Sequence, residues 1–142
     1  MHAISSVGEV VRRSRMYETQ PVGGPAGQPP YLNAVVVLVL RAEVEPERLL
    51  EELLALEQRF GRVRRVVHEA RTLDLDILDV AGVVQDAASL TLPHPRMMER
   101  PFVLIPLLDV APTWRDPRTG TPAADALERL DQGGVRASGH TW

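Results

Sequence analysis

Hydrophobic and polar positions along the chain predict strands and helices in alternation. Residues 7–16 alternate imperfectly between valine and polar positions, which indicates a half-exposed strand that leads into Tyr17-Glu18-Thr19. Residues 31–40 are dominated by Val and Leu without a period of two. Such a run is typical of a central strand that is covered on both faces.

The helical signals follow later in the chain. Pro46 stands where a first turn would begin, and apolar residues recur at three- and four-residue spacing up to Gly61, namely Leu49, Leu50, Leu53, Leu54, Leu56 and Phe60. This pattern predicts an amphipathic helix with a glycine stop. Residues 101–110 predict a short buried helix, broken or bent near Pro106, and residues 123–130 predict another short helix.

The remaining segments complete an α+β plan. Residues 20–30 contain four prolines and three glycines and are predicted as a loop, and residues 72–80 as a strand. Residues 83–92 are predicted as either a small hairpin or an extended turn. Strands and helices in this order favour an α/β (α+β) sandwich with helices packed on a sheet. The length of 142 residues suits one domain, 1–142.

Composition narrows the chemistry. All 16 basic residues are arginine, so a lysine-dependent phosphate loop and a Schiff base are excluded, and the absence of cysteine excludes thiolate chemistry. The longest apolar run, residues 34–40, is roughly a third of the ~20 residues that a membrane helix needs. With a net charge of −3 and no signal-peptide pattern, we expect a cytoplasmic protein without a membrane segment or a general attraction to nucleic acid.

The sharpest local feature is Arg71-Thr72-Leu73-Asp74-Leu75-Asp76-Ile77. In a strand, Asp74 and Asp76 share one face and the apolar residues share the other. Two adjacent carboxylates repel unless a cation compensates them, and Mg²⁺ bound to a polyphosphate would do so. The alternative is a solvated strand edge with two surface aspartates.

Arginines gather next to this acidic pair. Residues 61–71 contain four of them, Arg62, Arg64, Arg65 and Arg71. Metal together with guanidinium groups is what a phosphate site requires. The alternative is mutual salt bridging on a surface loop, which stabilises little.

Three further features each have two interpretations. The glycines of residues 20–30 suggest a phosphate cradle, but a strand follows them rather than a helix, which favours a structural loop. His94 lies between two prolines and suits either a phosphate hydrogen bond or a structural turn. Tyr31 and Asn33 share a strand face that could bind a flat heterocycle or serve ordinary sheet packing.

These segments, in this order, resemble the 6-hydroxymethyl-7,8-dihydropterin pyrophosphokinases of folate synthesis. The resemblance rests on Tyr17-Glu18-Thr19, residues 28–34, Gly61-Arg62-Val63-Arg64, the Arg-Thr-Leu-Asp-Leu-Asp run and Leu92-Pro93-His94-Pro95-Arg96, and it covers about residues 14–112. It implies a ferredoxin-like fold with helices packed on a mainly antiparallel sheet, a monomer, and transfer of pyrophosphate from ATP to the pterin hydroxymethyl group with release of AMP. The role of residues 113–142 is left open.

The resemblance also implies residue roles. Asp74 and Asp76 match the ligands of two Mg²⁺ ions, and with Arg64 and Arg71 they form the expected catalytic set. Further matches to ATP contacts are Glu57, Arg62, Thr91, His94 and Arg100. Matches to the pterin pocket are Thr19, Val22, Tyr31, Asn33 and Phe102, with Tyr31 and Phe102 on either side of the ring.

The chain also departs from the family pattern. His68-Glu69-Ala70 replaces the usual loop, whose tryptophan caps the pterin, and Ser89 stands where an arginine often contacts ATP. Both changes predict weaker binding of the substrates. The family begins with a strand, a Gly-Ser-Asn turn and a helix, so the chain is expected to start late and an exposed sheet edge could favour a dimer. Two alternatives stay open: a degenerate nucleotide- or pterin-binding module, and an Arg-rich RNA-binding surface, which the 4% aromatic content disfavours.

Overall fold

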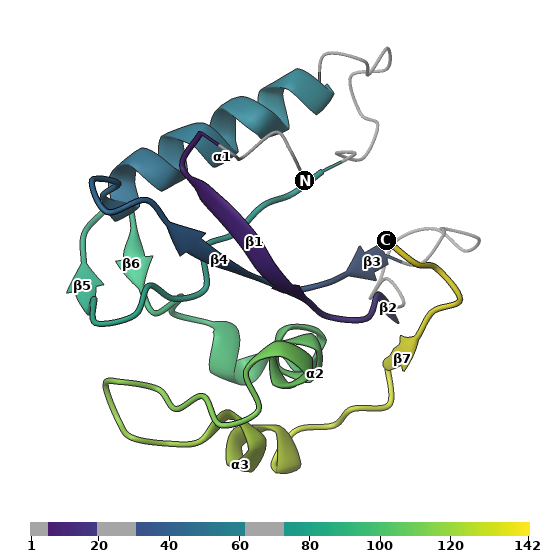
Figure 1. Cartoon of the computed structure of the whole chain (residues 1–142). Coiled ribbons are helices and arrows are strands. Elements are labelled where there is room, and N and C mark those ends of the chain that lie inside the picture. The colour runs from purple at the N-terminus through teal and green to yellow at the C-terminus, as the bar shows by residue number, and fades with distance from the viewer. Residues whose placement is uncertain (1–5, 20–30, 62–72) are drawn as a thin grey trace. The chain divides into compact units, whose positions relative to one another are not determined.

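A computed structural model describes residues 6–19, 31–61 and 73–142 of the chain (Figure 1). The chain divides into two compact units. The first consists of Met1–Glu9 and Leu38–His94, and the second of Val10–Val37 and Pro95–Trp142. The division falls within strand β1 (Gly8–Arg13) and within strand β4 (Val36–Leu40), which pair with each other.

Helix α1 (Pro46–Gly61) contributes two leucines to the buried core of the first unit. Its start at Pro46 is as predicted, and Gly61 is its last residue. Leu49 and Leu56 are buried, whereas Leu54 and Phe60 are about half exposed. The predicted apolar set was therefore too wide, because Leu54 lies about 100° around the helix from Leu53 and so falls outside the buried stripe.

The predicted strand at residues 72–80 is wrong. Residues 73–79 belong to no strand, and Val80 makes only an isolated bridge with Val83. Strand pairing is a property of two segments, and no described neighbour forms a ladder with this one. The predicted alternation survives, because Asp74 and Asp76 are exposed while Ile77 is buried.

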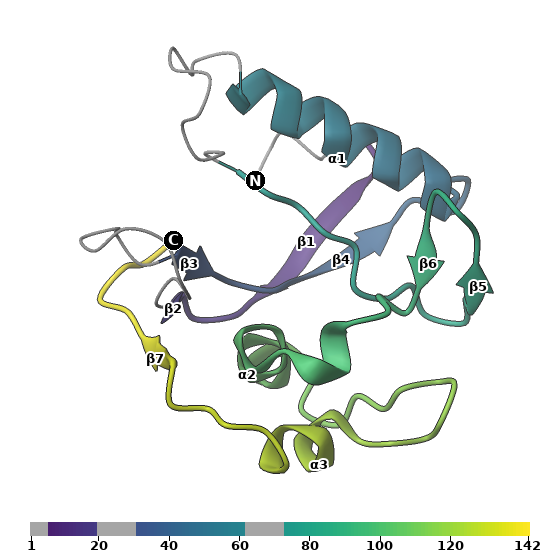
Figure 2. The ribbon, with the colours of Figure 1, turned by 180° about the vertical axis from the view of Figure 1, so that it is seen from behind.

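Residues 83–92 form a small hairpin in the first unit, the first of the two alternatives predicted for them. Strands β5 (Gln85–Asp86) and β6 (Thr91–Leu92) are antiparallel and lie side by side (Figure 2). The Gln85 side-chain amide donates to the Leu90 carbonyl and to Glu47 Oε1, both at 3.0 Å. The hairpin is thereby tied to the first turn of α1.

The predicted continuous strand at residues 31–40 is interrupted. Strand β3 (Tyr31–Asn33) pairs with β2 (Tyr17–Thr19), whereas β4 pairs with β1. Between them, Val35 exchanges hydrogen bonds with the buried Ser14: the Val35 N–H donates to the hydroxyl at 2.9 Å, and the Ser14 N–H donates to the Val35 carbonyl at 2.8 Å. Burial on both faces is also wrong, since Val39 is 57% exposed. The single apolar run at residues 31–40 therefore contains two strands that belong to different sheets.

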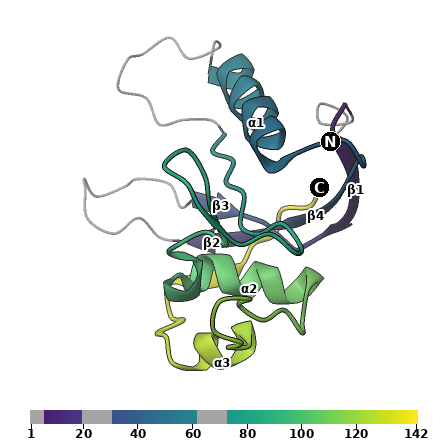
Figure 3. The same ribbon diagram turned by 90° about the vertical axis from the view of Figure 1, so that its left-hand side faces the viewer.

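One helix packs on the sheet of the second unit and is covered by two others. The 3-10 helix η2 (Met97–Glu99) leads into α2 (Pro101–Val110), which contacts both β2 and β3 and packs against α3 (Ala123–Glu128) (Figure 3). Both predicted α-helices are present, but the predicted break near Pro106 is wrong because α2 is one helix from Pro101 to Val110. Pro106 lies inside α2 and has no N–H, so the carbonyl of Phe102 lacks its usual partner, yet the helix continues to Val110.

The C-terminal residues belong to the same sheet, which the sequence did not indicate. Strand β7 (Val135–Ala137) pairs antiparallel with β2, so the strand order is β3-β2-β7. Beyond it, the Trp142 indole donates to the Ser14 carbonyl at 2.7 Å, and the Arg13 guanidinium lies 5.8 Å from the centroid of the Trp142 ring. Residues after 112 thus take part in the structure of the second unit.

The fold class is α+β with antiparallel strand pairing, as predicted. Within the described ranges, no helix has the length and apolar character needed to cross a membrane.

Candidate functional site

The sequence-predicted site residues divide between the two units. Those expected to bind metal and ATP lie mainly in the first unit: Glu57, Asp74, Asp76, Thr91 and His94. Arg100 and the residues expected to bind the pterin lie in the second: Thr19, Tyr31, Asn33 and Phe102. Val22, Arg62, Arg64 and Arg71 lie outside the described residues.

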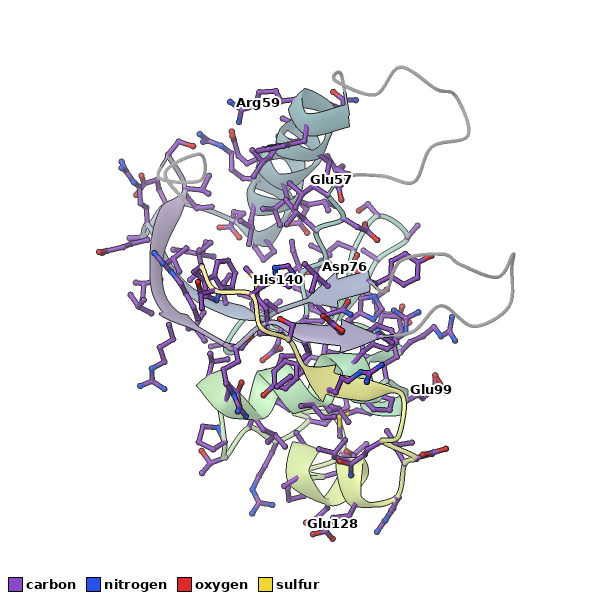
Figure 4. All side chains as sticks on the ribbon, turned by 90° about the vertical axis from the view of Figure 1, so that its right-hand side faces the viewer. Glu57, Arg59, Asp76, Glu99, Glu128 and His140 are labelled. Carbon is purple, nitrogen blue, oxygen red and sulfur yellow. The ribbon has the colours of Figure 1, made fainter. Side chains whose placement is uncertain are left out.

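The acidic pair lies on an exposed stretch of the first unit, residues 74–76, which is termed the open edge. Asp74 and Asp76 are exposed, whereas Leu75 between them is partly buried and Ile77 after them is buried. Two solvent-accessible carboxylates with hard oxygen atoms fit Mg²⁺, which usually takes one or two protein carboxylates and keeps water or substrate phosphate in its other positions. Figure 4 labels Asp76 on this segment and Glu57 on α1.

Glu57 contacts the acidic segment directly. Its Oε2 accepts a hydrogen bond from the Leu75 backbone N–H at 2.6 Å, which is at the short end for such a bond. Leu75 is the residue between the two aspartates. The carboxylate expected from the resemblance to lie near the nucleotide is therefore connected through the backbone to the expected metal ligands.

His94 is tied to the same segment. Its backbone N–H donates to the Leu78 carbonyl at 2.7 Å, four residues after Asp74. Residues 73–78 therefore contain the acidic pair and are hydrogen-bonded through their backbone to Glu57 and His94, two residues that are also expected to lie near ATP. In the part of the chain that the structure describes, no three His, Cys, Asp or Glu side chains are grouped closely enough to hold a metal ion.

Thr91 lies on β6 and its hydroxyl is used within the hairpin. It donates to the Ala87 carbonyl at 3.3 Å and lies 3.4 Å from Asp86 Oδ1. The side chain is partly exposed. A role for Thr91 in ATP binding stays a prediction.

The expected pterin residues on β2 and β3 share one face of the sheet. In the antiparallel register Thr19 lies opposite Tyr31, and Tyr17 lies opposite Asn33. Directly opposed residues, and residues two apart on a strand, point to the same face. The Asn33 amide donates to the Thr19 hydroxyl at 2.8 Å, and Tyr31 is 56% exposed. An aromatic ring and a fixed amide therefore lie together on this face.

A polar cluster that sequence reasoning missed lies on the same face. The buried Tyr17 donates its hydroxyl to Asp109 Oδ2 at 2.7 Å, and the Arg15 side chain donates to the Tyr17 hydroxyl at 2.9 Å. Asp109 also accepts the Arg15 backbone N–H at 3.1 Å. Two signals could have indicated this cluster: Tyr17 is two residues before Thr19, and Asp109 is the single charged residue in the apolar helix α2.

The cluster changes the ionisation of its members. Burial and then the hydrogen bond to Asp109 raise the pKa of Tyr17. Burial would raise the pKa of Asp109, but hydrogen bonds from Tyr17 and Arg15 outweigh it, and the pKa is lowered. The pair therefore stays in one state, a neutral phenol that donates to a carboxylate, across the neutral pH range.

Arg100 and Phe102 lie at the N-terminal end of α2. The Arg100 guanidinium lies 5.6 Å from the centroid of the Phe102 ring, within the range of a cation–π contact. Arg100 also precedes the first residue of α2 with an extended backbone. The structure thus places the expected phosphate-binding arginine next to the expected ring-stacking residue.

The fold and these two groups of side chains define an α+β protein with exposed acidic residues in its first unit and an aromatic, amide-bearing sheet face in its second. Residues 1–112 match the family model for 7,8-dihydro-6-hydroxymethylpterin-pyrophosphokinase (HPPK), and the chain belongs to this family. The match includes all of residues 14–112, on which the resemblance rested.

Named relatives agree with the family. A 2-amino-4-hydroxy-6-hydroxymethyldihydropteridine pyrophosphokinase of Synechocystis sp. is 45% identical over 123 residues, which cover 87% of this chain and 61% of that protein. The protein of the same name from Porphyromonas gingivalis is 43% identical, covering 82% and 79%. The folic acid synthesis protein fol1 of Schizosaccharomyces pombe is 35% identical, covering 96% and 18%. The chain thus spans about three fifths of the Synechocystis relative's length.

Proposed function

We propose that this chain transfers pyrophosphate from ATP to 6-hydroxymethyl-7,8-dihydropterin, which gives AMP and the pterin diphosphate in folate biosynthesis. The observation that carries the proposal is the open pair Asp74 and Asp76 on a segment tied to Glu57 and His94, in a chain of the HPPK family. Relatives named as pyrophosphokinases favour an enzyme over a binding-only module.

In the proposed reaction, the pterin hydroxymethyl oxygen attacks the β-phosphorus of ATP. The bond from that phosphorus to the oxygen bridging the α-phosphorus breaks, AMP leaves with the bridging oxygen, and the hydroxyl proton passes to solvent. Charge spreads over the phosphate oxygens in such a transfer, so alignment and electrostatic stabilisation provide most of the catalysis.

The proposed binding of metal and ATP depends on the exposed carboxylates of Asp74 and Asp76. Asp74 and Asp76 would hold two Mg²⁺ ions, which when bound would neutralise charge on the polyphosphate. Arg64, Arg71 and Arg100 would bind phosphate oxygens through planar guanidinium groups, with Arg62 as an accessory. Thr91 and His94 would add contacts to ATP. Because the chain contains no lysine, arginine is its only permanently charged side-chain cation, and the phosphate contacts are assigned to arginines.

The pterin side rests on the shared face of β2 and β3. Tyr31 and Phe102 would stack on the ring, and Thr19, Val22 and Asn33 would form the rest of the pocket. The bond between the Asn33 amide and the Thr19 hydroxyl supports this, because it fixes one donor and leaves the Asn33 carbonyl oxygen to accept from a ligand.

Two measurements test the proposal together. Titration calorimetry with a non-hydrolysable ATP analogue, with and without pterin, measures binding, and an AMP-release assay with ATP, pterin and Mg²⁺ measures turnover. Asp76→Ala should lower turnover about 10²–10³-fold, as loss of one transition-state contact does. Glu51→Ala, which removes an exposed carboxylate on α1, is the matched control.

The outcomes separate the hypotheses. Binding without AMP release would support the degenerate module instead, and binding of neither ligand would contradict both. Near-wild-type AMP release by the Asp76 variant would contradict the metal assignment. The proposal includes a cytoplasmic location and a monomer, and size-exclusion chromatography would reveal a dimer.

A further inference from the structure

We propose that Glu57 is a positioning residue: it fixes the backbone between Asp74 and Asp76, so that both carboxylates stay on the open edge. The inference deepens the proposed function and rests on it, because it concerns the proposed metal side. The sequence resemblance implied that Glu57 contacts ATP. The structure also gives its carboxylate a partner within the chain, the Leu75 N–H at 2.6 Å.

The acidic segment needs such support because it has no ladder. Residues 73–79 form no strand, so strand pairing with the described part of the chain does not fix which side chains face outward. A rotation that moved the segment by one residue would exchange the leucine face and the aspartate face. The buried Ile77 side chain fixes the apolar side of the segment, and Glu57 fixes the Leu75 N–H.

Glu57 lies on a helix whose position is fixed by its buried leucines. It follows the buried Leu56 on α1, and Leu49 two turns earlier is buried as well, so the helix is anchored along this face. Glu57 itself is only partly buried. A side chain on a packed helix holds its partner more accurately than a loop residue would.

In the described part of the chain, Glu57 is not grouped closely enough with Asp74 and Asp76 to form a three-carboxylate metal site. Among the described residues, no three acidic or histidine side chains converge closely enough for a metal ion. Mg²⁺ needs only one or two carboxylates. Residues that orient metal ligands without touching the metal commonly change metal affinity about 10–100-fold when they are lost.

Three variants test the inference. Glu57→Ala removes the acceptor, Glu57→Gln keeps an acceptor oxygen but removes the charge, and Glu51→Gln makes the same charge change at an exposed position of α1. Mn²⁺ binding is measured by electron paramagnetic resonance in the presence of a non-hydrolysable ATP analogue. Exchange of the Leu75 amide hydrogen is measured by NMR in the absence of metal and nucleotide.

We expect Glu57→Ala to weaken Mn²⁺ binding about 10–100-fold and to speed Leu75 exchange. Glu57→Gln should retain Mn²⁺ affinity within about threefold and keep Leu75 protected, since it preserves the hydrogen bond and not the charge. Glu51→Gln should change neither. If Glu57→Ala fails to fold by circular dichroism, the Gln variant alone decides.

Two results would overturn the inference while the proposed function stands. One is Mn²⁺ binding by Glu57→Ala equal to that of the wild type. The other is a loss in Glu57→Gln as large as in the Ala variant with Leu75 still protected, which would indicate a direct charge contact with metal or nucleotide. If the wild-type chain bound no Mn²⁺ with the nucleotide, the metal assignment in the proposed function would fail, and this inference with it.

Discussion

The hydroxyl of Tyr17 donates a 2.7 Å hydrogen bond to Asp109, which ties the central strand β2 to the last turn of α2. The two residues are 92 positions apart in the chain. Tyr17 shares its sheet face with Thr19 and Asn33, so the same contact anchors the face on which the proposed pterin residues lie.

Tyr17→Phe should lower the free energy of unfolding by about 1.5–3 kcal/mol, the usual range for a hydrogen bond to a charged group. The phenyl ring keeps the packing of a buried side chain, so the loss isolates the hydroxyl. Tyr31→Phe is the matched control, because Tyr31 is 56% exposed and surface changes usually stay within about 0.5 kcal/mol. Urea denaturation measures both, and equal losses in the two variants would contradict the assignment.

Asp109 should make stability depend on pH at the acid end. Its pKa in the folded chain is lowered, because hydrogen bonds from Tyr17 and Arg15 outweigh the effect of burial. A carboxyl group with a lowered folded pKa stabilises the fold above its unfolded pKa of about 3.9, and this contribution is lost as pH falls through the folded value. The unfolding free-energy difference between wild type and Asp109→Asn should therefore shrink between about pH 5 and the acid limit of folding. A difference that stays constant over this range would contradict the prediction.

Local signals predicted the helices well. Pro46 and the leucines at helical spacing gave α1 its start and its buried stripe, and the apolar run after Arg100 gave α2 despite Pro106. Such features depend on neighbouring residues, which sequence periodicity reports directly. The alternation of Asp74 and Asp76 against Ile77 was predicted for the same reason.

Features that depend on distant partners could not be predicted from these patterns. The break between β3 and β4 reflects a change of pairing partner, and β7 was missed because only its pairing with β2 makes it a strand. The bond between Glu57 and Leu75 joins a helix to a segment 18 residues later. No local periodicity identifies such pairs.

Gly8 should be intolerant of a side chain. A Cβ atom at this position would lie 2.6 Å from the Val39 carbonyl oxygen and 3.2 Å from the Leu40 Cα, both backbone atoms that cannot move away cheaply. Gly8→Ala should therefore destabilise the chain by about 1–3 kcal/mol through overpacking. Gly134→Ala, where no atom lies within 4 Å of the new Cβ, is the control and should change stability by less than about 1 kcal/mol. Thermal denaturation compares the two, and a Gly8 variant as stable as the control would show that β1 and β4 approach less closely.

Asn33→Ala should weaken pterin binding while leaving ATP binding unchanged. The Asn33 amide is held by the Thr19 hydroxyl at 2.8 Å, and its carbonyl oxygen remains to accept from a ligand. Loss of one hydrogen bond of about 1–3 kcal/mol corresponds to roughly 5–150-fold in affinity. The matched control is Leu32→Ala, on the same strand but with its side chain on the opposite face and 49% exposed. Calorimetry with the pterin and with the ATP analogue distinguishes the two ligands: equal weakening by both variants, or a loss of ATP affinity in Asn33→Ala, would mean that the shared face of β2 and β3 does not bind the pterin.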